Sequence, residues 1–124
     1  MIDFQNGTFV KLRRVEDEDI GSTVRKLLLP DEEIVGVFKT VRDRVIFTDR
    51  RVMAVNIQGA TGKKQDITSF PYRKIVAYSI ETSGVLDTDS ELELLFGGVG
   101  RIRFEFFGSA HIAEIGQALA KYTL

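Results

Sequence analysis

The sequence predicts a mainly β domain with a minor α component: seven antiparallel strands forming a barrel or orthogonal sandwich, with one helix before them and one after. Seven short runs rich in Val, Ile and Phe follow one another at close spacing. The apolar residues before and after these runs recur at helical spacing instead. With 124 residues, 44% of them hydrophobic, the chain is long enough for one domain with its own core.

The first expected element is an amphipathic helix over residues 17–29. Acidic residues crowd its first turn and Pro30 ends it. Its apolar residues recur three and four positions apart: Ile20, Val24, Leu27 and Leu28. Residues 1–26 are therefore assigned to an N-terminal extension carrying the helix and residues 27–124 to the barrel with its C-terminal helix, in one structural domain. No element is assigned to residues 1–16.

The seven expected strands are each bounded by Gly, Asp, Asn, Pro or a charge pair. In chain order they span residues 34–39, 44–48, 51–57, 64–70, 74–81, 90–96 and 101–107. Such closely spaced strands are typical of an antiparallel sandwich or barrel.

The hairpin of the second and third strands is apolar on both faces. A turn at Asp49 and Arg50 places Val45, Phe47, Val52 and Ala54 on one face. The same turn places Ile46, Met53 and Val55 on the other face. One face supplies the core, and the other is either an exposed interface or buried beneath the N-terminal helix. Both alternatives stay open. The candidate oligomer interface is Ile46, Met53 and Val55 with Arg50 and Arg51.

The last hairpin has the clearest register, because polar and apolar residues alternate strictly in both strands. A three-residue loop at 97–99 sets Leu94 opposite Ile102 and Glu93 opposite Arg103, so that faces and charges agree. A two-residue loop would move Leu94 to the wrong face. Gly97 or Gly98 is expected in the left-handed conformation.

After Gly108 the helical period returns, which predicts a C-terminal helix with Ser109 as its candidate N-cap. Its apolar stripe consists of Ile112, Ile115, Leu119 and Tyr122.

Several local motifs agree with this order of elements. They are Val-Arg-Asp at 41–43, Phe-Thr-Asp-Arg-Arg at 47–51, Thr-Gly-Lys-Lys at 61–64 followed by Pro71-Tyr72, and the Gly-Asp-Asp-Glu pattern within 84–92. As a set they resemble the bacterial pleckstrin-homology (PH) domain family over about residues 27–122. The resemblance implies a barrel with the C-terminal helix at one open end, and assembly into ring-like homo-oligomers. It implies no known ligand.

Basic residues on the first hairpin suggest a second function. Eukaryotic lipid-binding members of this fold carry a lysine and two further basic residues there, and these bind inositol phosphates. Lys39, Arg42 and Arg44 follow that order, and Lys63 and Lys64 are positioned to join from the next loop. The competing interpretation is a solvated hairpin, or ion pairs at a subunit contact.

Nothing in the sequence favours catalysis. The chain has no cysteine and a single histidine, His111, which we expect on the surface, so no catalytic residue, metal ligand or cofactor is expected. The calcium-loop-like and phosphate-loop-like stretches at 87–91 and 59–64 are expected to be ordinary turns.

The charge distribution favours self-association. Residues 39–74 hold nine basic and three acidic side chains, whereas both flanks are acidic. We therefore expect a non-catalytic, self-assembling binding or scaffold module that forms a homo-oligomer larger than a dimer. The alternative is a module for anionic phospholipid or phosphate ligands; a protein partner is also possible. A net charge of −1 gives no reason to expect nucleic acid, and no apolar run is long enough to cross a membrane. A cytoplasmic location is expected.

Overall fold

The computed structural model describes residues 7–61, 63–82, 89–98, 100–108 and 111–124. Within these ranges the fold has two helices and eight strands, together with two short 3₁₀ turns, η1 (Asp17–Ile20) and η2 (Tyr72–Lys74). The helices are α1 (Ser22–Leu27) and α2 (Ile112–Thr123). The strands are β1 (Gly7–Val15), β2 (Ile34–Lys39), β3 (Arg44–Thr48), β4 (Arg51–Gln58), β5 (Lys64–Pro71), β6 (Ile75–Thr82), β7 (Asp89–Phe96) and β8 (Gly100–Phe107).

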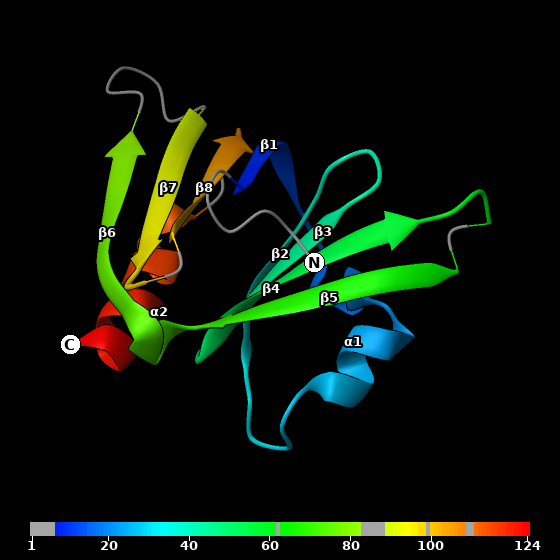
Figure 1. Cartoon of the computed structure of the whole chain (residues 1–124), viewed down its shortest axis with the longest axis horizontal. Coiled ribbons are helices and arrows are strands. Elements are labelled where there is room, and N and C mark those ends of the chain that lie inside the picture. The colour runs from blue at the N-terminus through cyan, green and yellow to red at the C-terminus, as the bar shows by residue number, and fades with distance from the viewer. Residues whose placement is uncertain (1–6, 62, 83–88, 99, 109–110) are drawn as a thin grey trace.

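All eight strands belong to one bent sheet with the order β5-β4-β3-β2-β1-β8-β7-β6. Figure 1 shows its two halves: β6, β7 and β8 stand on one side, β2 to β5 cross toward the other, and α2 lies at their shared corner. The expectation of a mainly β fold with a C-terminal helix is confirmed.

The N-terminal strand β1 corrects the expected strand count and pairing. It pairs antiparallel with β2 and parallel with β8, so the sheet is mixed, with eight strands instead of seven antiparallel ones. A bulge at Val10 and Lys11 interrupts the register, and Lys11 adopts a φ of 55°. Because of the bulge, Phe9 and Leu12, three positions apart, both reach the core.

The seven expected strands all form, with ends within one residue of expectation. The hairpin registers are also confirmed: Phe47 pairs with Val52 around the turn at Asp49 and Arg50. Leu94 pairs with Ile102 and Glu93 with Arg103. Gly98 has a φ of 78°, the left-handed conformation expected for this loop.

The N-terminal helix is shorter than expected. Gly21 has a φ of 85°, which no right-handed helix contains, so it separates η1 from the six residues of α1. Ile20 and Val24 are nevertheless buried, while Leu27 is 48% exposed. Leu28 is partly buried and packs against the cluster that contains Ile20 and Val24, so only Leu27 departs from the expected apolar stripe.

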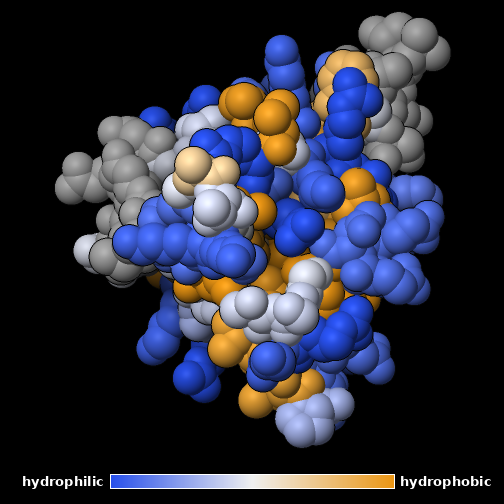
Figure 2. Space-filling view, turned by 90° about the vertical axis from the view of Figure 1, so that its right-hand side faces the viewer, coloured by the Kyte–Doolittle hydropathy of each residue, from blue (hydrophilic) through white to orange (hydrophobic). Residues whose placement is uncertain are grey.

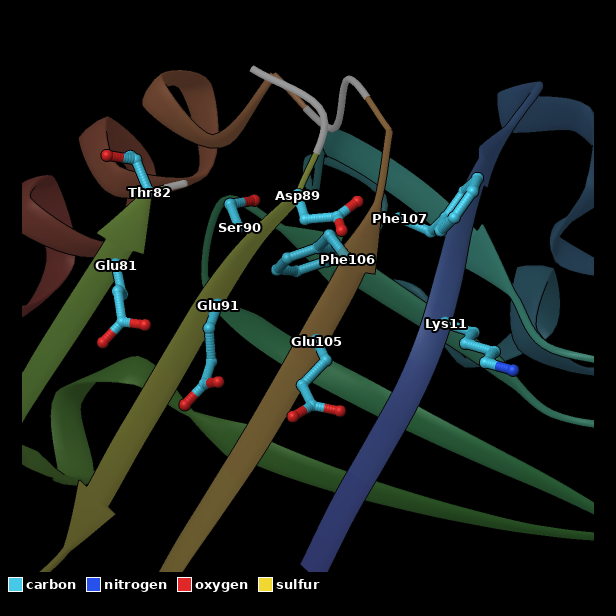
Figure 3. A pocket seen from close by; sticks show the side chains of 9 residues that line it. All are labelled: Lys11, Glu81, Thr82, Asp89, Ser90, Glu91, Glu105, Phe106 and Phe107. Atoms are coloured by element: carbon cyan, nitrogen blue, oxygen red, sulfur yellow. The ribbon is translucent and has the colours of Figure 1, made fainter. Parts of the chain in front are cut away.

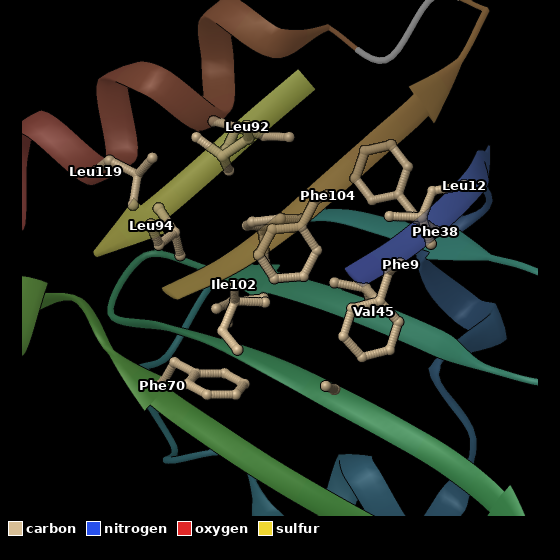
Figure 4. Close-up of a cluster of buried hydrophobic side chains, with 14 of the residues drawn as sticks. Phe9, Leu12, Phe38, Val45, Phe70, Leu92, Leu94, Ile102, Phe104 and Leu119 are labelled. Atoms are coloured by element: carbon tan, nitrogen blue, oxygen red, sulfur yellow. The ribbon is translucent and has the colours of Figure 1, made fainter. Parts of the chain in front are cut away.

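The main core lies between the two halves of the sheet (Figure 4). Phe47 forms edge contacts with Phe38 and Phe104, with ring centroids 5.8 and 5.4 Å apart. Ile115 and Leu119 of α2 are fully buried in the same cluster, so this helix packs on the open end of the barrel as expected.

Some expectations lie outside the described residues: the N-cap role of Ser109, the loop residue Val99, Gly62 of the third motif and residues 84–88 of the fourth. The helix α2 begins after His111, which has a φ of 53°.

Candidate interaction surfaces

The second apolar face of the β3–β4 hairpin is covered by the chain itself. Ile46, Met53 and Val55 are each 0% exposed and pack in a second cluster with Ile20 and Val24. The N-terminal segment thus supplies the partner that this face requires, which answers the alternative left open by the sequence. The prediction that these three residues belong to an exposed oligomer interface is wrong, because none of them is on the surface of the chain.

The two arginines of the candidate interface are held by acidic residues of the same chain. Arg50 Nη2 lies 2.6 Å from Asp31 Oδ2. Arg51 donates from Nε and Nη2 to the two carboxylate oxygens of Glu32, each at 2.9 Å. These pairs fix the β3–β4 turn to the segment that leads into β2.

The Glu32 carboxylate is the centre of a buried polar network. It also accepts hydrogen bonds from Thr48 Oγ1 at 2.6 Å and from the Leu29 N–H at 3.1 Å. Burial by itself raises the pKa of Glu32, but the hydrogen bonds from Arg51, Thr48 and Leu29 outweigh it and hold the pKa below 4.5. Beside it, the buried Tyr72 hydroxyl donates to the Thr48 carbonyl oxygen at 2.7 Å. Burial raises the pKa of Tyr72 far above its ordinary value.

The five basic residues predicted as a ligand site do not converge. Lys39 and Arg44 pair directly and share the outer face of the sheet, on which Val55 also lies. Lys64 pairs with Gln58, three positions beyond Val55, and therefore extends from the opposite face. Arg42 donates to the Gly59 carbonyl oxygen at 3.0 Å, which ties the first hairpin to the β4–β5 turn. Lys63 lies exposed in that turn.

A basic residue that sequence reasoning missed joins Lys39 and Arg44. Arg13 pairs with Lys39, so three cations occupy one row across β1, β2 and β3. Residues 12–15 read Leu-Arg-Arg-Val, which does not alternate, so the sequence carries no strand signal that would have pointed to Arg13.

Three carboxylates form a second row on the outer face of β6–β8. Glu81 pairs with Glu91, and Glu91 pairs with Glu105. Figure 3 shows these side chains on one side of three neighbouring strands, with Lys11 pointing away from them. Arg103 Nε lies 3.1 Å from Glu91 Oε1. In the part of the chain described here, neither Glu81 nor Glu105 has a cation within 4.0 Å. We call the three glutamates the acidic row.

The opposite end of β6 carries a different surface, where two grooves meet at η2. Arg73 and Lys74 are exposed there, and no carboxylate of the described residues lies within 4.0 Å of either. Leu27, Leu29 and Val76 are exposed by 48%, 50% and 64% in the same grooves. We call this surface, defined by these five residues, the basic corner.

The face of the molecule that Figure 2 shows is mostly polar. Figure 2 shows the face with α1 and the hairpin tips, where hydrophilic side chains predominate and hydrophobic residues show between them. His111 is exposed by 58% at its side chain, and its Nδ1 lies 3.4 Å from Glu114 Oε1. Among the described ranges, no three His, Asp or Glu side chains gather as a metal site would require. No helix in those ranges has the length and apolar character needed to cross a membrane.

Comparisons with known proteins agree with this fold. The chain matches the family model described as bacterial PH domain over residues 3–123. It is 46% identical over 96 residues to the uncharacterized protein YjqA of Bacillus subtilis, covering 76% of this chain and 77% of that protein. It is 27% identical over 96 residues to the uncharacterized protein YozO of the same organism, covering 77% and 82%.

Two solved structures are similar to this one. A protein from Shewanella loihica with a pleckstrin-homology domain superposes with a TM-score of 0.73 at 26% identity, covering 93% of this chain and 99% of that chain. A pleckstrin-homology domain from Shewanella amazonensis gives 0.61 at 32% identity, covering 89% and 90%. None of these matches indicates a catalytic family. The chain belongs to the bacterial pleckstrin-homology domain family.

Proposed function

We propose that the chain is a non-catalytic module that assembles with copies of itself head to tail, through the basic corner of one copy and the acidic row of the next. The observation that carries this proposal is the placement of unpaired opposite charges at the two ends of one strand. Arg73 and Lys74 precede β6, whereas Glu81 lies near its end.

The geometry favours a head-to-tail contact over a two-fold one. A strand of eight residues spans roughly 25 Å at about 3.3 Å per residue, so the two surfaces lie far apart on one molecule. A two-fold axis that passed through either surface would bring that surface against a like-charged copy of itself. A head-to-tail contact joins unlike surfaces and, when the rotation closes, forms a ring larger than a dimer.

Exposed apolar residues supply a source of affinity at both surfaces. Val76 and the two leucines lie in the basic corner, and Phe107, 47% exposed, lines the depression beside the acidic row. Burial of these side chains stabilises a contact, whereas the charges steer its formation and orientation.

The free sheet edges favour assembly as well. Within the described residues, β5 and β6 are the two ends of the sheet and do not pair with each other. Between Ile75 and Thr82, Glu81 is the only charged side chain and no proline occurs, so β6 has little of the protection typical of edge strands.

Light scattering after size-exclusion chromatography tests the proposal. We expect the wild type to exceed twice the mass of 13.9 kDa, and the variants Arg73→Glu/Lys74→Glu and Glu81→Lys/Glu105→Lys each to give smaller species. Combining all four changes in one chain restores charge complementarity and is expected to restore the larger mass. The matched control is Arg25→Glu/Lys26→Glu on the exposed face of α1. A wild-type mass of about 14 kDa at high protein concentration would refute self-assembly.

A further inference from the structure

We propose that the outer face of β2–β5 is a docking surface for an amphipathic helix of another protein, and that residues 17–28 of the chain cover it when that helix is not bound. We call these residues the cover segment. The partner helix carries apolar side chains in place of Ile20 and Val24, and a carboxylate that faces Arg44. This inference goes beyond the proposed assembly and depends on neither the acidic row nor the cations of the basic corner.

The sheet face beneath the cover segment is continuous and apolar. Its fully buried residues come from three neighbouring strands and are Val37, Ile46, Met53 and Val55. Ile57 on β4 and Ile67 on β5 extend the face as partly buried residues. Figure 1 shows α1 on the side of these strands that faces away from β6–β8. A face of this kind has to be covered, and the apolar stripe of an amphipathic helix is one element that covers it.

The cover segment is a poor helix for this task. Gly21 has a φ of 85° and a ψ of 154°, a conformation essentially restricted to glycine, and it interrupts the chain between η1 and α1. The helix α1 that follows has six residues, fewer than an isolated helix needs to be stable. No side-chain hydrogen bond caps the start of η1 or of α1. Little regular structure is therefore lost when the segment leaves the sheet, which favours local opening.

The cover segment also leaves a polar group of the sheet unsatisfied. Arg44 Nε is buried and has no hydrogen-bond acceptor among the described residues. Arg44 Nη1 lies 3.1 Å from the position of a β-carbon on Gly21, so the guanidinium packs against a residue without a side chain. The three acidic residues of η1 are exposed, and none of them forms an ion pair with Arg44. A buried donor without an acceptor destabilises the covered state, and a carboxylate placed here would satisfy it.

The charge at the border of the face identifies the kind of partner. Lys39 pairs with Arg44 and Arg13 pairs with Lys39, so a row of cations borders the apolar face across β1–β3. A helix with acidic residues beside its apolar stripe is complementary to this arrangement. An added strand is not, because strand addition needs the free backbone of a sheet edge and a sheet face offers only side chains.

Docking requires the cover segment to leave, so the partner and the segment compete for the same face. The apparent affinity of a partner is the intrinsic affinity reduced by the fraction of molecules that are open. A substitution that weakens the cover raises this fraction, and the apparent affinity rises by the same factor.

The test uses the full chain as receptor and fluorescent peptides of residues 16–29 as probes, with affinity measured by fluorescence anisotropy. One peptide carries Gly21→Glu and its control carries Gly21→Gln. Both changes allow a continuous helix, but only the glutamate is charged. The receptors are the wild type, Val24→Ala, and Val24→Ala combined with Arg44→Met. Val24→Ala shortens a buried side chain of the cover segment, and Arg44→Met removes the unpaired donor but keeps a long apolar side chain.

We expect Val24→Ala to bind the Gly21→Glu peptide about tenfold more tightly than the wild type does, because the open fraction is larger. The same receptor should prefer this peptide about tenfold over the Gly21→Gln peptide, the value of one charge-assisted hydrogen bond. Addition of Arg44→Met should remove that preference. Val41→Ala, at a fully exposed valine of the β2–β3 turn, is the matched control and should bind as the wild type does.

Two further measurements keep the test decisive. Ile20→Val, which removes one methyl group, is a second variant that loosens the cover, and thermal melts verify that both variants fold. In hydrogen exchange of the wild type, the amides of the cover segment should exchange faster than those of β3 and β4, and Arg44→Met should slow them.

The inference is overturned when neither loosened variant binds the Gly21→Glu peptide, or when the preference for glutamate persists without Arg44. Exchange of the cover segment only as fast as β4 would overturn it as well. Light scattering of the same variants keeps the two proposals separate, because neither Val24 nor Arg44 belongs to the basic corner or the acidic row. A change in peptide binding at an unchanged mass concerns the docking surface alone.

Discussion

Arg51 and Glu32 are joined by two parallel hydrogen bonds of 2.9 Å at a place where the glutamate side chain is completely buried and that of the arginine is 22% exposed. The pair connects the start of β4 to the segment before β2, and its carboxylate is also bonded by Thr48 and the Leu29 N–H. Removal of one partner of such a pair leaves the charge of the other uncompensated, which destabilises the folded protein.

Replacement of Glu32 by Gln is expected to lower the free energy of unfolding by about 2 kcal/mol near neutral pH, because Arg51 loses its counterion. The folded-state pKa of Glu32 lies below its ordinary value of 4.5. Its contribution is therefore complete above that value and is lost as pH falls through the folded-state pKa. Urea unfolding between about pH 7 and pH 3 should show the gap between wild type and variant shrinking with acidification. Glu33→Gln, on an exposed neighbour, serves as control. A gap that stays constant to the lowest pH would contradict this role of the carboxylate.

Tyr72→Phe removes the hydroxyl that donates to the Thr48 carbonyl oxygen at 2.7 Å in a fully buried position. We expect a loss of about 1 kcal/mol in denaturant unfolding, since the buried carbonyl oxygen loses this donor. Tyr78→Phe is the comparison, because the Tyr78 hydroxyl makes no hydrogen bond within the described structure. Equal stability of the two variants would mean that the Tyr72 hydrogen bond makes no net contribution to the free energy of unfolding.

Leu119→Ala tests whether α2 is an integral part of the core. Leu119 is fully buried against the sheet, so removal of its side chain leaves a cavity and should cost about 2–4 kcal/mol. Gln117→Ala, exposed on the same helix, should change stability by about 0.5 kcal/mol or less. Thermal melts that show the same small shift for both variants would indicate that the helix does not stabilise the barrel.

Gly98 isolates a purely conformational effect. Its φ is 78°, and a β-carbon at this position would meet nothing within 4 Å. Gly98→Ala should therefore destabilise the β7–β8 hairpin by about 1 kcal/mol through backbone strain alone, and Gly98→Asn should cost less because asparagine tolerates this conformation better. The reverse order of the two variants in thermal stability would rule out this explanation.

Local patterns predicted most of the fold. The alternation around Leu94 and Ile102 determined both a register and a loop length, because a shift of one residue would have exposed the whole apolar face. The strand β1 was missed for an equally local reason. Its bulge at Lys11 breaks the alternation, so Phe9 and Leu12 appear to lie on opposite faces when both are buried.

The interaction surfaces could not be predicted from the sequence, because they depend on contacts between segments that are far apart along the chain. The apolar side chain of Met53 does not reveal whether another molecule or the chain's own Ile20 covers it, and the structure places Ile20 there. Likewise, the spacing of Lys39 and Arg44 suggested a cluster on the first hairpin. Only the pairing of β1 with β2 shows that their neighbour is Arg13, and that pairing joins segments far apart in the sequence.

The position of β1 between β2 and β8 also bears on how the molecule folds. Strands β2 to β5 and β6 to β8 are successive neighbours and can form by closing short loops, whereas the register of β1 with β8 joins Gly7 to Ile102. Closing so long a loop has a large entropic cost before any contact compensates for it, and a high contact order slows folding. The pairing of β1 with β2 and β8 is therefore expected to limit the folding rate of this domain. The two meanders, β2–β5 and β6–β8, would form first, and β1 would then join them.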